Sequence, residues 1–155
     1  QPIHRPMARD QRVAYIAENP SQMMLFQDMS YLRNLTFCLP RQIDSWFRRR
    51  SIYRSLRREL TPELGAVFDK DIRDLNTQEK YALIFRRVLL QQPRVVFFEQ
   101  PFWGNDVLLQ QHIERQVQLL LAKKIAVVVL IVGIYDAFPL AERTLIYKNG
   151  HLLTQ

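Results

Sequence analysis

The chain has 155 residues, of which 48% are hydrophobic and 24% charged, the balance of a single globular domain with a real core. Its single cysteine excludes an internal disulfide, and its longest uncharged apolar run, residues 125–135, is too short to span a membrane. Much of the net charge of +7 comes from arginines between residues 48 and 58. Such a cluster could bind a phosphate backbone or anionic lipid, or it could be a solvated helix face or one that contacts a partner protein. No base-reading motif accompanies them, so nucleic acid is the less favoured partner.

The first part of the chain is predicted to hold one short strand and one short helix. Residues 12–17 are an apolar run that ends at turn signals in residues 18–20, which is typical of a strand. Ser30 is a suitable N-cap for a helix that ends near Leu35, and Pro40 interrupts the chain soon afterwards.

Three helices are expected next. In residues 42–60, apolar side chains recur at helical spacing and arginines fill the other face. Thr61 followed by Pro62 predicts a cap and the first turn of a separate helix. A longer amphipathic helix is then predicted to follow residues 74–79 and to end before Pro93.

The last part of the chain alternates strands and helices. Residues 94–98 are a continuous apolar run rich in β-branched and aromatic side chains, which predicts a strand buried on both faces. We then expect a helix in 107–124, a fully apolar strand in 125–132, a short helical piece in 137–141 and a hairpin in 144–153 around an Asn-Gly turn. This order predicts an α/β fold, with a helical subdomain (30–92) inserted into an α/β core (1–29 and 93–155).

The end of the strand at 94–98 carries the residues that point to a family. Glu99 follows the apolar run, and then come Gln100, a Pro-Phe pair and a Gly-Asn-Asp turn. This stretch resembles the Walker B strand of ABC ATPases with its D-E-P-F-x-G-L-D ending, and other landmarks of that family follow in register along essentially the whole chain. The resemblance implies a P-loop-NTPase-like parallel sheet with a C-terminal β-hairpin, equivalent to the later two-thirds of an ABC transporter nucleotide-binding domain.

The phosphate-binding loop of that family is absent from this sequence. No Walker A motif, G-x-x-x-x-G-K-[ST], occurs, and the four glycines are too dispersed to form one. Because proteins rarely begin with Gln, we expect that the N-terminal portion of the domain is missing. ATP and magnesium would then bind only with a P-loop supplied upstream or by a partner.

The resemblance assigns degenerate roles to four acidic or amide residues. Glu99 takes the position of the acid that holds magnesium, and Gln100 takes that of the general base; an amide can orient a water but cannot accept its proton. Glu18 stands where the family has the Q-loop glutamine, or else it belongs to an ordinary turn. Asp106 keeps the acid of the D-loop.

Two further phosphate-contacting elements are altered. The family signature, L-S-G-G-Q, aligns with residues 75–79, where Asn76, Thr77 and Gln78 replace its polar and glycine positions and side chains obstruct a phosphate. The alternative is that Asn76 simply caps a helix whose first turn follows it. Either Ile134 or Tyr135 occupies the position of the switch histidine.

Together these departures predict a degenerate ABC domain that keeps its fold and has lost turnover, a structural or regulatory ATP-binding subunit of a transporter. Its expected partners are a second ABC ATPase domain, identical or not, and a transmembrane subunit that contacts the helical subdomain at the cytoplasmic face of the membrane. Three alternatives stay open. They are a nucleotide-independent interaction scaffold, a fragment of an active ABC ATPase, and nucleic-acid binding through the arginine-rich helix.

Overall fold

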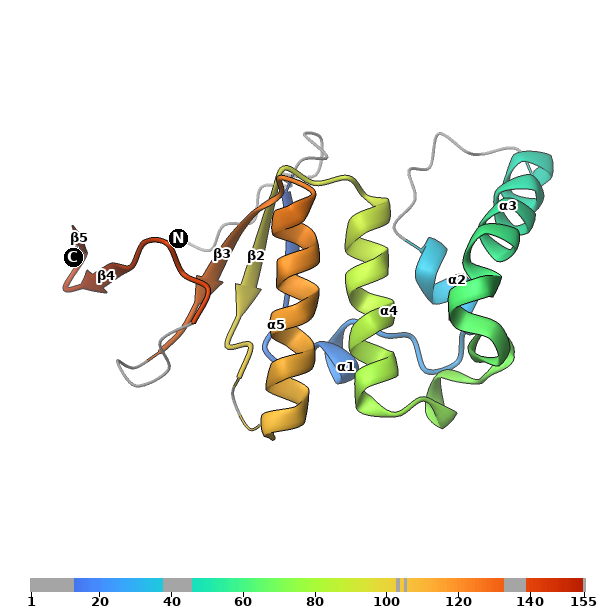
Figure 1. The fold of residues 1–155 in the computed structure, drawn as a ribbon, viewed down its shortest axis with the longest axis horizontal. Helices are drawn as coiled ribbons and strands as arrows, with labels where there is room; N and C mark the ends of the chain where they lie inside the picture. Colours follow the sequence, from blue (N-terminus) through green and yellow to red (C-terminus); the bar gives the residue numbers. More distant parts are fainter. Residues whose placement is uncertain (1–12, 38–45, 103, 105, 133–138, 155) are drawn as a thin grey trace.

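The central feature of the fold is a three-stranded parallel sheet (Figure 1). The computed structural model describes residues 13–37, 46–102, 104, 106–132 and 139–154. The strands are β1 (Val13–Ile16), β2 (Val95–Glu99) and β3 (Ala126–Leu130), in the order β1-β2-β3. Both pairings are parallel, so the predicted mixed α/β fold with a parallel sheet is confirmed.

Two long helices, α4 (Thr77–Leu90) and α5 (Val107–Ala122), lie side by side over one face of this sheet (Figure 1). Beneath them, Ile16, Val96 and Phe98 are completely buried. The ring of Phe98 meets that of Phe85 from α4 edge-on, with ring centroids 5.7 Å apart. The hydrophobic core therefore lies between this face of the sheet and the two helices.

The other face of the sheet is largely exposed, and this corrects the expectation of strands buried on both sides. Successive side chains of a strand point to opposite faces, and the parallel register aligns Tyr15 with Phe97 and Phe97 with Val128. We call this surface the open face; it consists of Val13, Tyr15, Val95, Phe97, Glu99, Ala126, Val128 and Leu130. Its residues are exposed or only half-buried, and among the described elements the long helices α4 and α5 cover the opposite side (Figure 1).

The segment between β1 and β2 is helical. It contains α1 (Pro20–Met23), α2 (Tyr31–Thr36), α3 (Trp46–Leu64), the short 3-10 helices η2 (Gly65–Asp69) and η3 (Ile72–Asp74), and α4. Ser30 caps α2 as predicted, since its hydroxyl accepts the backbone N–H of Arg33 at 3.4 Å. The first helix, α1, was not predicted. None of the described helices is both long and apolar enough to cross a lipid bilayer.

The predicted helix break at Thr61-Pro62 is wrong, because α3 continues through both residues to Leu64. The hydroxyl of Thr61 donates a hydrogen bond to the carbonyl of Arg57 within the same helix and does not cap a new one. Pro62 has no N–H, so α3 lacks one helical hydrogen bond in its last turn. The helix instead ends at Gly65, whose φ of +45° is the left-handed conformation that glycine adopts readily.

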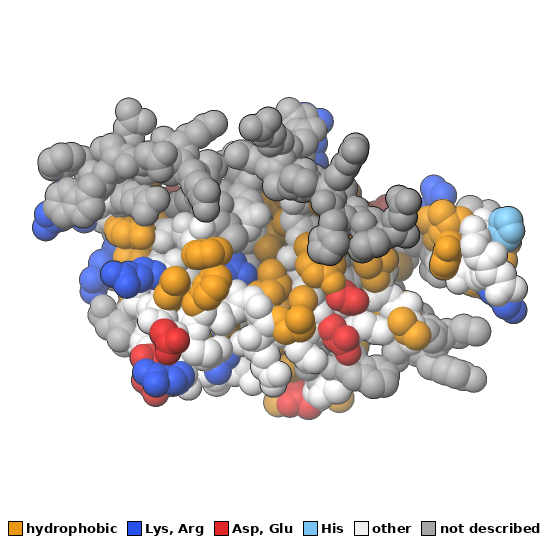
Figure 2. Space-filling view, turned by 180° about the vertical axis from the view of Figure 1, so that it is seen from behind, with side chains coloured by type: hydrophobic (Ala, Val, Ile, Leu, Met, Phe, Trp, Pro, Cys, Tyr) orange, Lys and Arg blue, Asp and Glu red, His pale blue; other side chains and the backbone are white. Residues whose placement is uncertain are grey.

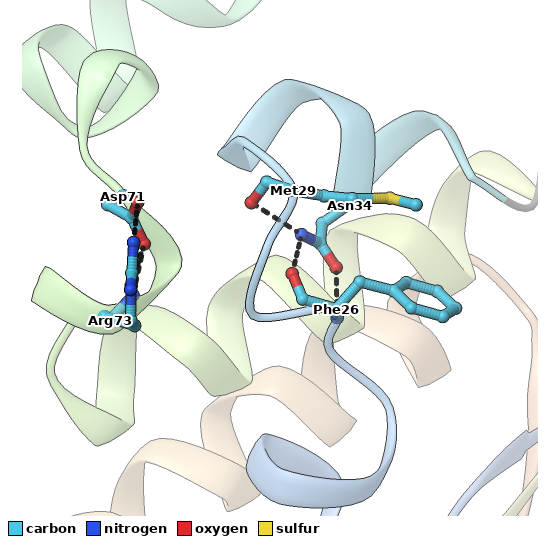
Figure 3. A network of polar contacts seen from close by, with 5 residues as sticks. All are labelled: Phe26, Met29, Asn34, Asp71 and Arg73. Carbon is cyan, nitrogen blue, oxygen red and sulfur yellow. Dashed lines mark hydrogen bonds and ion pairs between the residues drawn. The ribbon is translucent and has the colours of Figure 1, made fainter.

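A buried asparagine fixes the loop between α1 and α2 (Figure 3). The side chain of Asn34 is fully buried. Its Oδ1 accepts the N–H of Phe26 at 2.8 Å, and its Nδ2 lies 2.9 Å from the carbonyl oxygen of Phe26, 3.2 Å from that of Met29 and 3.3 Å from that of Ser30. One side chain therefore satisfies backbone groups on both sides of the loop.

The chain ends in a separate antiparallel hairpin of β4 (Leu145–Lys148) and β5 (His151–Thr154). Asn149 and Gly150 connect the strands with φ of +50° and +85°, so the predicted Asn-Gly hairpin turn is confirmed. Figure 1 shows the hairpin beyond β3, to the side of the sheet. Of the short helical piece expected at 137–141, the described residues 139–141 form a turn rather than a helix.

Candidate functional site

The described residues of the predicted site lie at one end of the molecule. The strands of the sheet run in the same direction, and their carboxyl ends lie at the same end as the N-termini of α4 and α5 (Figure 1). Glu18, Glu99 and Gln100 follow or end strands, whereas Asn76 and Asp106 begin helices. In open α/β sheets ligands bind at this edge, so the topology places these residues where chemistry would take place.

Glu99, the predicted magnesium position, is engaged by a tyrosine that the sequence did not single out. The hydroxyl of Tyr15 on β1 donates a hydrogen bond to Oε2 of Glu99 at the end of β2. This hydrogen bond, with desolvation and the nearby charges of Glu99 and Glu18, raises the pKa of Tyr15 to about 12. One oxygen of the carboxylate that the resemblance assigns to magnesium therefore already accepts a hydrogen bond from a phenol.

Gln100, the predicted general-base position, is held by β3. Its backbone N–H donates to the carbonyl of Leu130 at 2.8 Å, and its Oε1 lies 3.4 Å from the N–H of Val132. Its φ of +45° lies in the left-handed region, which is uncommon for a residue with a side chain. An amide in this position can accept a hydrogen bond but cannot take a proton from water at neutral pH.

Glu18 lies two residues beyond β1 and is half-buried. Its negative charge contributes to the raised pKa of Tyr15. Within the described ranges, no three Asp, Glu, His or Cys side chains gather into a group that could hold a metal ion. Glu18 and Glu99 lie at this edge of the sheet, and carboxylate oxygens are ligands of the type that magnesium prefers.

The second part of the site is an open pocket between the starts of α4 and α5. Its volume is about 360 Å³. It is lined by Asn76, Thr77, Gln78, Asp106, Leu108 and Leu109. The structure thus brings the residues aligned with the family signature together with the residue aligned with the D-loop acid.

Both helix starts at this pocket are closed by their own side chains. Asn76 and Glu79 form a capping box, in which Oδ1 of Asn76 accepts the N–H of Glu79 and Oε2 of Glu79 accepts the N–H of Asn76, each at 2.8 Å. Asp106 accepts the N–H of Leu109 at 2.8 Å. A phosphate needs such N–H groups free, and it would meet the carboxylates of Glu79 and Asp106, so the residues present here do not fit one.

The outcome for the individual residues is mixed. Asn76 is the helix cap that the sequence offered as its plain alternative, and Thr77 begins the first turn of α4. Ile134 and Tyr135, offered for the switch position, lie outside the described residues. The sequence analysis did not identify Tyr15 as a site residue. The signal for it was that an aromatic side chain with a polar hydroxyl lies on the strand that precedes Glu18.

Comparison with known proteins supports the ABC relationship. No family profile matches the chain. Over 142 residues, covering 92% of the chain, it is 27% identical to the lipopolysaccharide export system ATP-binding protein LptB of Acidithiobacillus ferridurans. The chain spans 57% of the length of that relative. The chain is thus similar to an ABC ATP-binding protein along most of its own length.

Proposed function

We propose that this chain is an ABC-type nucleotide-binding domain that does not hydrolyse ATP and serves as a structural or regulatory subunit of an ABC transporter. The similarity to LptB, an ATP-binding protein of an export system, supports the class of protein. The parallel sheet with its acidic carboxyl edge supports the same assignment. As part of this proposal, the domain works at the cytoplasmic face of a membrane with a second ATPase domain.

The observation that carries the loss of hydrolysis is Gln100 at the end of β2. A water that attacks a γ-phosphate needs a base or a residue that orients it, and loss of the base removes one of the largest contributions to the rate. Here the amide oxygen of Gln100 faces the N–H of Val132, and the neighbouring carboxylate of Glu99 accepts the hydroxyl of Tyr15. Neither side chain is arranged to take a proton from water.

ATP and magnesium belong to this proposal only with help from outside the described site. Glu99 and Glu18 would be the magnesium ligands, and the triphosphate would be held by a P-loop supplied upstream or by a partner domain. The capped N-termini of α4 and α5 support this division, because the N–H groups of Glu79 and Leu109 are bonded to side chains and the carboxylates of Glu79 and Asp106 would repel a phosphate.

Phosphate release from Mg-ATP tests the loss of hydrolysis. We expect the purified chain to release no phosphate above the protein-free background, and we expect Gln100→Ala to behave identically. Gln100→Glu restores the family's acid and serves as the matched variant. The proposal fails if the chain hydrolyses ATP and Gln100→Ala abolishes that activity, because the site would then be active with an amide.

A contact of the helical subdomain with a transmembrane subunit is part of the same proposal. Arg54, Arg57 and Arg58 on α3 are exposed, which suits an acidic surface or anionic headgroups. Binding to the membrane partner should weaken steeply with salt and with either Arg54→Ser or Arg58→Ser, whereas Lys148→Ser on the hairpin serves as a charge-matched control. Binding that ignores salt and these arginines would exclude α3 as the contact.

The second candidate function is an interaction scaffold that binds no nucleotide. The Tyr15–Glu99 hydrogen bond favours it, because a phenol takes part of the magnesium position. Thermal unfolding with and without Mg-ATP separates the two functions. A stabilisation of more than about 1 kcal/mol at saturating ATP excludes the scaffold, since only a ligand bound to the native state raises its stability.

A further inference from the structure

The helix α3 carries a row of arginines that the predicted catalytic and phosphate-contacting positions do not use. Arg50, Arg54, Arg57 and Arg58 are all exposed. They follow one another at i, i+4, i+7 and i+8 within α3, and residues at this spacing lie on one face of an α-helix. We call these four side chains the arginine row. With a rise of about 1.5 Å per residue, the row is about 12 Å long.

The arginine row lies on a helix at the edge of the molecule. Figure 1 shows α3 beyond α2, at the end opposite to the hairpin. Among the described elements, the main contacts of α3 are with η2, which follows it directly. Its apolar side chains Ile52, Leu56 and Leu60 are half-buried, and Leu60 packs against the core. Figure 2, which views the molecule from behind, shows Lys and Arg side chains along the edge that carries α3. The helix therefore packs through its apolar side and leaves the arginine row at the surface.

The spacing of charges in α3 differs from that of an ordinary solvated helix. Such a helix commonly has acidic and basic residues three or four positions apart, where they stabilise it. Neither acid in the α3 sequence, Glu59 or Glu63, stands at that spacing from any member of the arginine row. Arg54 instead has the three other members of the row three or four residues away. Like charges at these spacings destabilise a helix, and an anionic surface outside the chain would offset that repulsion.

We propose that the arginine row binds the anionic phospholipid headgroups of a membrane surface. This inference rests on the proposed function, which places the domain beside a membrane, and it makes lipid a direct ligand in addition to the transmembrane subunit. A guanidinium group stays protonated and matches the geometry of a phosphate. A straight row of such groups on a convex helix can contact several headgroups of a flat bilayer at once. Because the apolar side chains of α3 are half-buried, the attraction is electrostatic rather than by insertion.

The same surface fits nucleic acid less well, although nucleic acid also offers phosphates. Proteins that bind single strands stack the bases on exposed aromatic side chains. Of the aromatic side chains in α3, the structure describes that of Tyr53, which is half-buried and lies outside the arginine row. Duplex DNA is therefore included as a competing ligand in the experiments below.

Co-sedimentation with lipid vesicles is the first test. The complete chain is mixed with vesicles of phosphatidylcholine alone, or with vesicles in which about a third of it is replaced by phosphatidylglycerol. We expect binding to the anionic vesicles alone, and this binding should weaken as the salt concentration rises. Equal binding to both vesicles, or no binding to either at low salt, overturns the proposal. No nucleotide is present, so a failure here leaves the claim about hydrolysis standing, and ATP hydrolysis by the chain would leave the vesicle result standing.

Matched substitutions test whether the arginine row makes the contact. Arg54→Ser should weaken binding to the anionic vesicles about fivefold, and Arg54→Ser plus Arg58→Ser about 25-fold, as expected for basic residues close to the membrane surface. The single control is Arg115→Ser, which removes an exposed arginine from α5, and the double control adds Lys148→Ser on the hairpin. Controls that weaken binding as much as the test variants would show that the net charge of the chain binds, and they would overturn the proposal.

Two further measurements separate a lipid surface from other anion sites. Arg54→Lys plus Arg58→Lys keeps the charge and should keep the binding; a loss of binding would contradict a surface recognised by charge. Circular dichroism of every variant checks that the helix content is unchanged. Competition with duplex DNA completes the test, and anionic vesicles should displace the chain from a fluorescent duplex. If the chain binds the duplex and not the vesicles, the arginine row is a nucleic-acid surface and the proposal is overturned.

Discussion

The substitution Asn34→Ala should be the most damaging polar change in the described part of the chain. Asn34 is fully buried, and its amide bonds the backbone of Phe26 at 2.8 and 2.9 Å and the carbonyl oxygen of Met29 at 3.2 Å (Figure 3). Alanine removes these bonds and leaves the N–H of Phe26 and the carbonyl oxygen of Met29 without their side-chain partner, whereas the carbonyl oxygen of Phe26 still accepts the N–H of Met29 at 3.1 Å.

The size of the effect follows from these contacts. The N–H of Phe26 and the carbonyl oxygen of Met29 lose the side-chain partner, and an orphaned backbone group costs about 1–3 kcal/mol each. The carbonyl of Ser30 loses less, because it also accepts the backbone N–H of Asn34 at 3.0 Å. We therefore expect Asn34→Ala to lower the free energy of unfolding by about 3 kcal/mol.

Two other asparagines provide internal controls for the same chemical change. Asn76 is an exposed N-cap within a capping box, and its replacement by Ala should cost about 1 kcal/mol. Asn19 is an N-cap whose side chain makes no capping hydrogen bond, and its replacement should cost less than about 0.5 kcal/mol. Urea unfolding followed by circular dichroism measures all three. The reasoning is refuted if Asn34→Ala costs no more than Asn19→Ala.

The variant Asn34→Asp adds a pH test of the same network. Its carboxylate would face the carbonyl oxygens of Phe26 and Met29, which raises the folded-state pKa of the introduced acid above its unfolded value of about 3.9. The decrease in the free energy of unfolding, relative to the native chain, should therefore be small at low pH. It should grow as the pH rises through the folded-state pKa of the introduced acid. If the stability lost in Asn34→Asp does not depend on pH, the N–H groups of the Asn34 amide are not needed as hydrogen-bond donors.

Three further predictions concern the core and the two acidic positions. Phe98→Ala should cost about 3–5 kcal/mol in urea unfolding, because Phe98 is completely buried against α4; a cost below about 1 kcal/mol would contradict that packing. The pKa of Tyr15, followed by NMR, should be about 12 in the native chain and nearer 10 in Glu99→Gln. The raised pKa contributes stability below pH 10 that is lost between pH 10 and about 12. An unchanged pKa of Tyr15 in Glu99→Gln would refute the hydrogen bond between the two residues. The hydrogen bond from Lys70 lowers the pKa of Glu79, so its stabilisation should be present above pH 4.5 and lost as the pH falls through the folded pKa; Lys70→Met should flatten this pH dependence.

The local elements of this fold were predictable because their signals are local. Ser30, Asn76 and the Asn149-Gly150 turn act through hydrogen bonds or φ values within a few residues, and each occurs where the sequence places it. Thr61 and Pro62 misled for a related reason. Proline after threonine is typical of a helix start, whereas here both residues lie in the last turn of α3.

The long-range features could not be predicted in the same way. An apolar run such as residues 95–98 indicates that both faces of a strand can be buried, but it does not indicate which element covers each face. The contact between Tyr15 and Glu99 depends on the register of β1 with β2, which no local pattern fixes. The edge of the sheet that carries Glu18, Glu99 and Gln100 was predictable, whereas the partner of each side chain was not.

The closed starts of α4 and α5 have a consequence for how this protein responds to the energy state of the cell. An ATPase that leaves such N–H groups free gains stability when nucleotide fills them, so its folded population follows the nucleotide supply. Here the side chains of Asn76, Glu79 and Asp106 already make hydrogen bonds at these helix starts. Under the proposed function, this end of the domain would gain no stability from ATP, which suits a subunit that stays constant beside a partner that cycles.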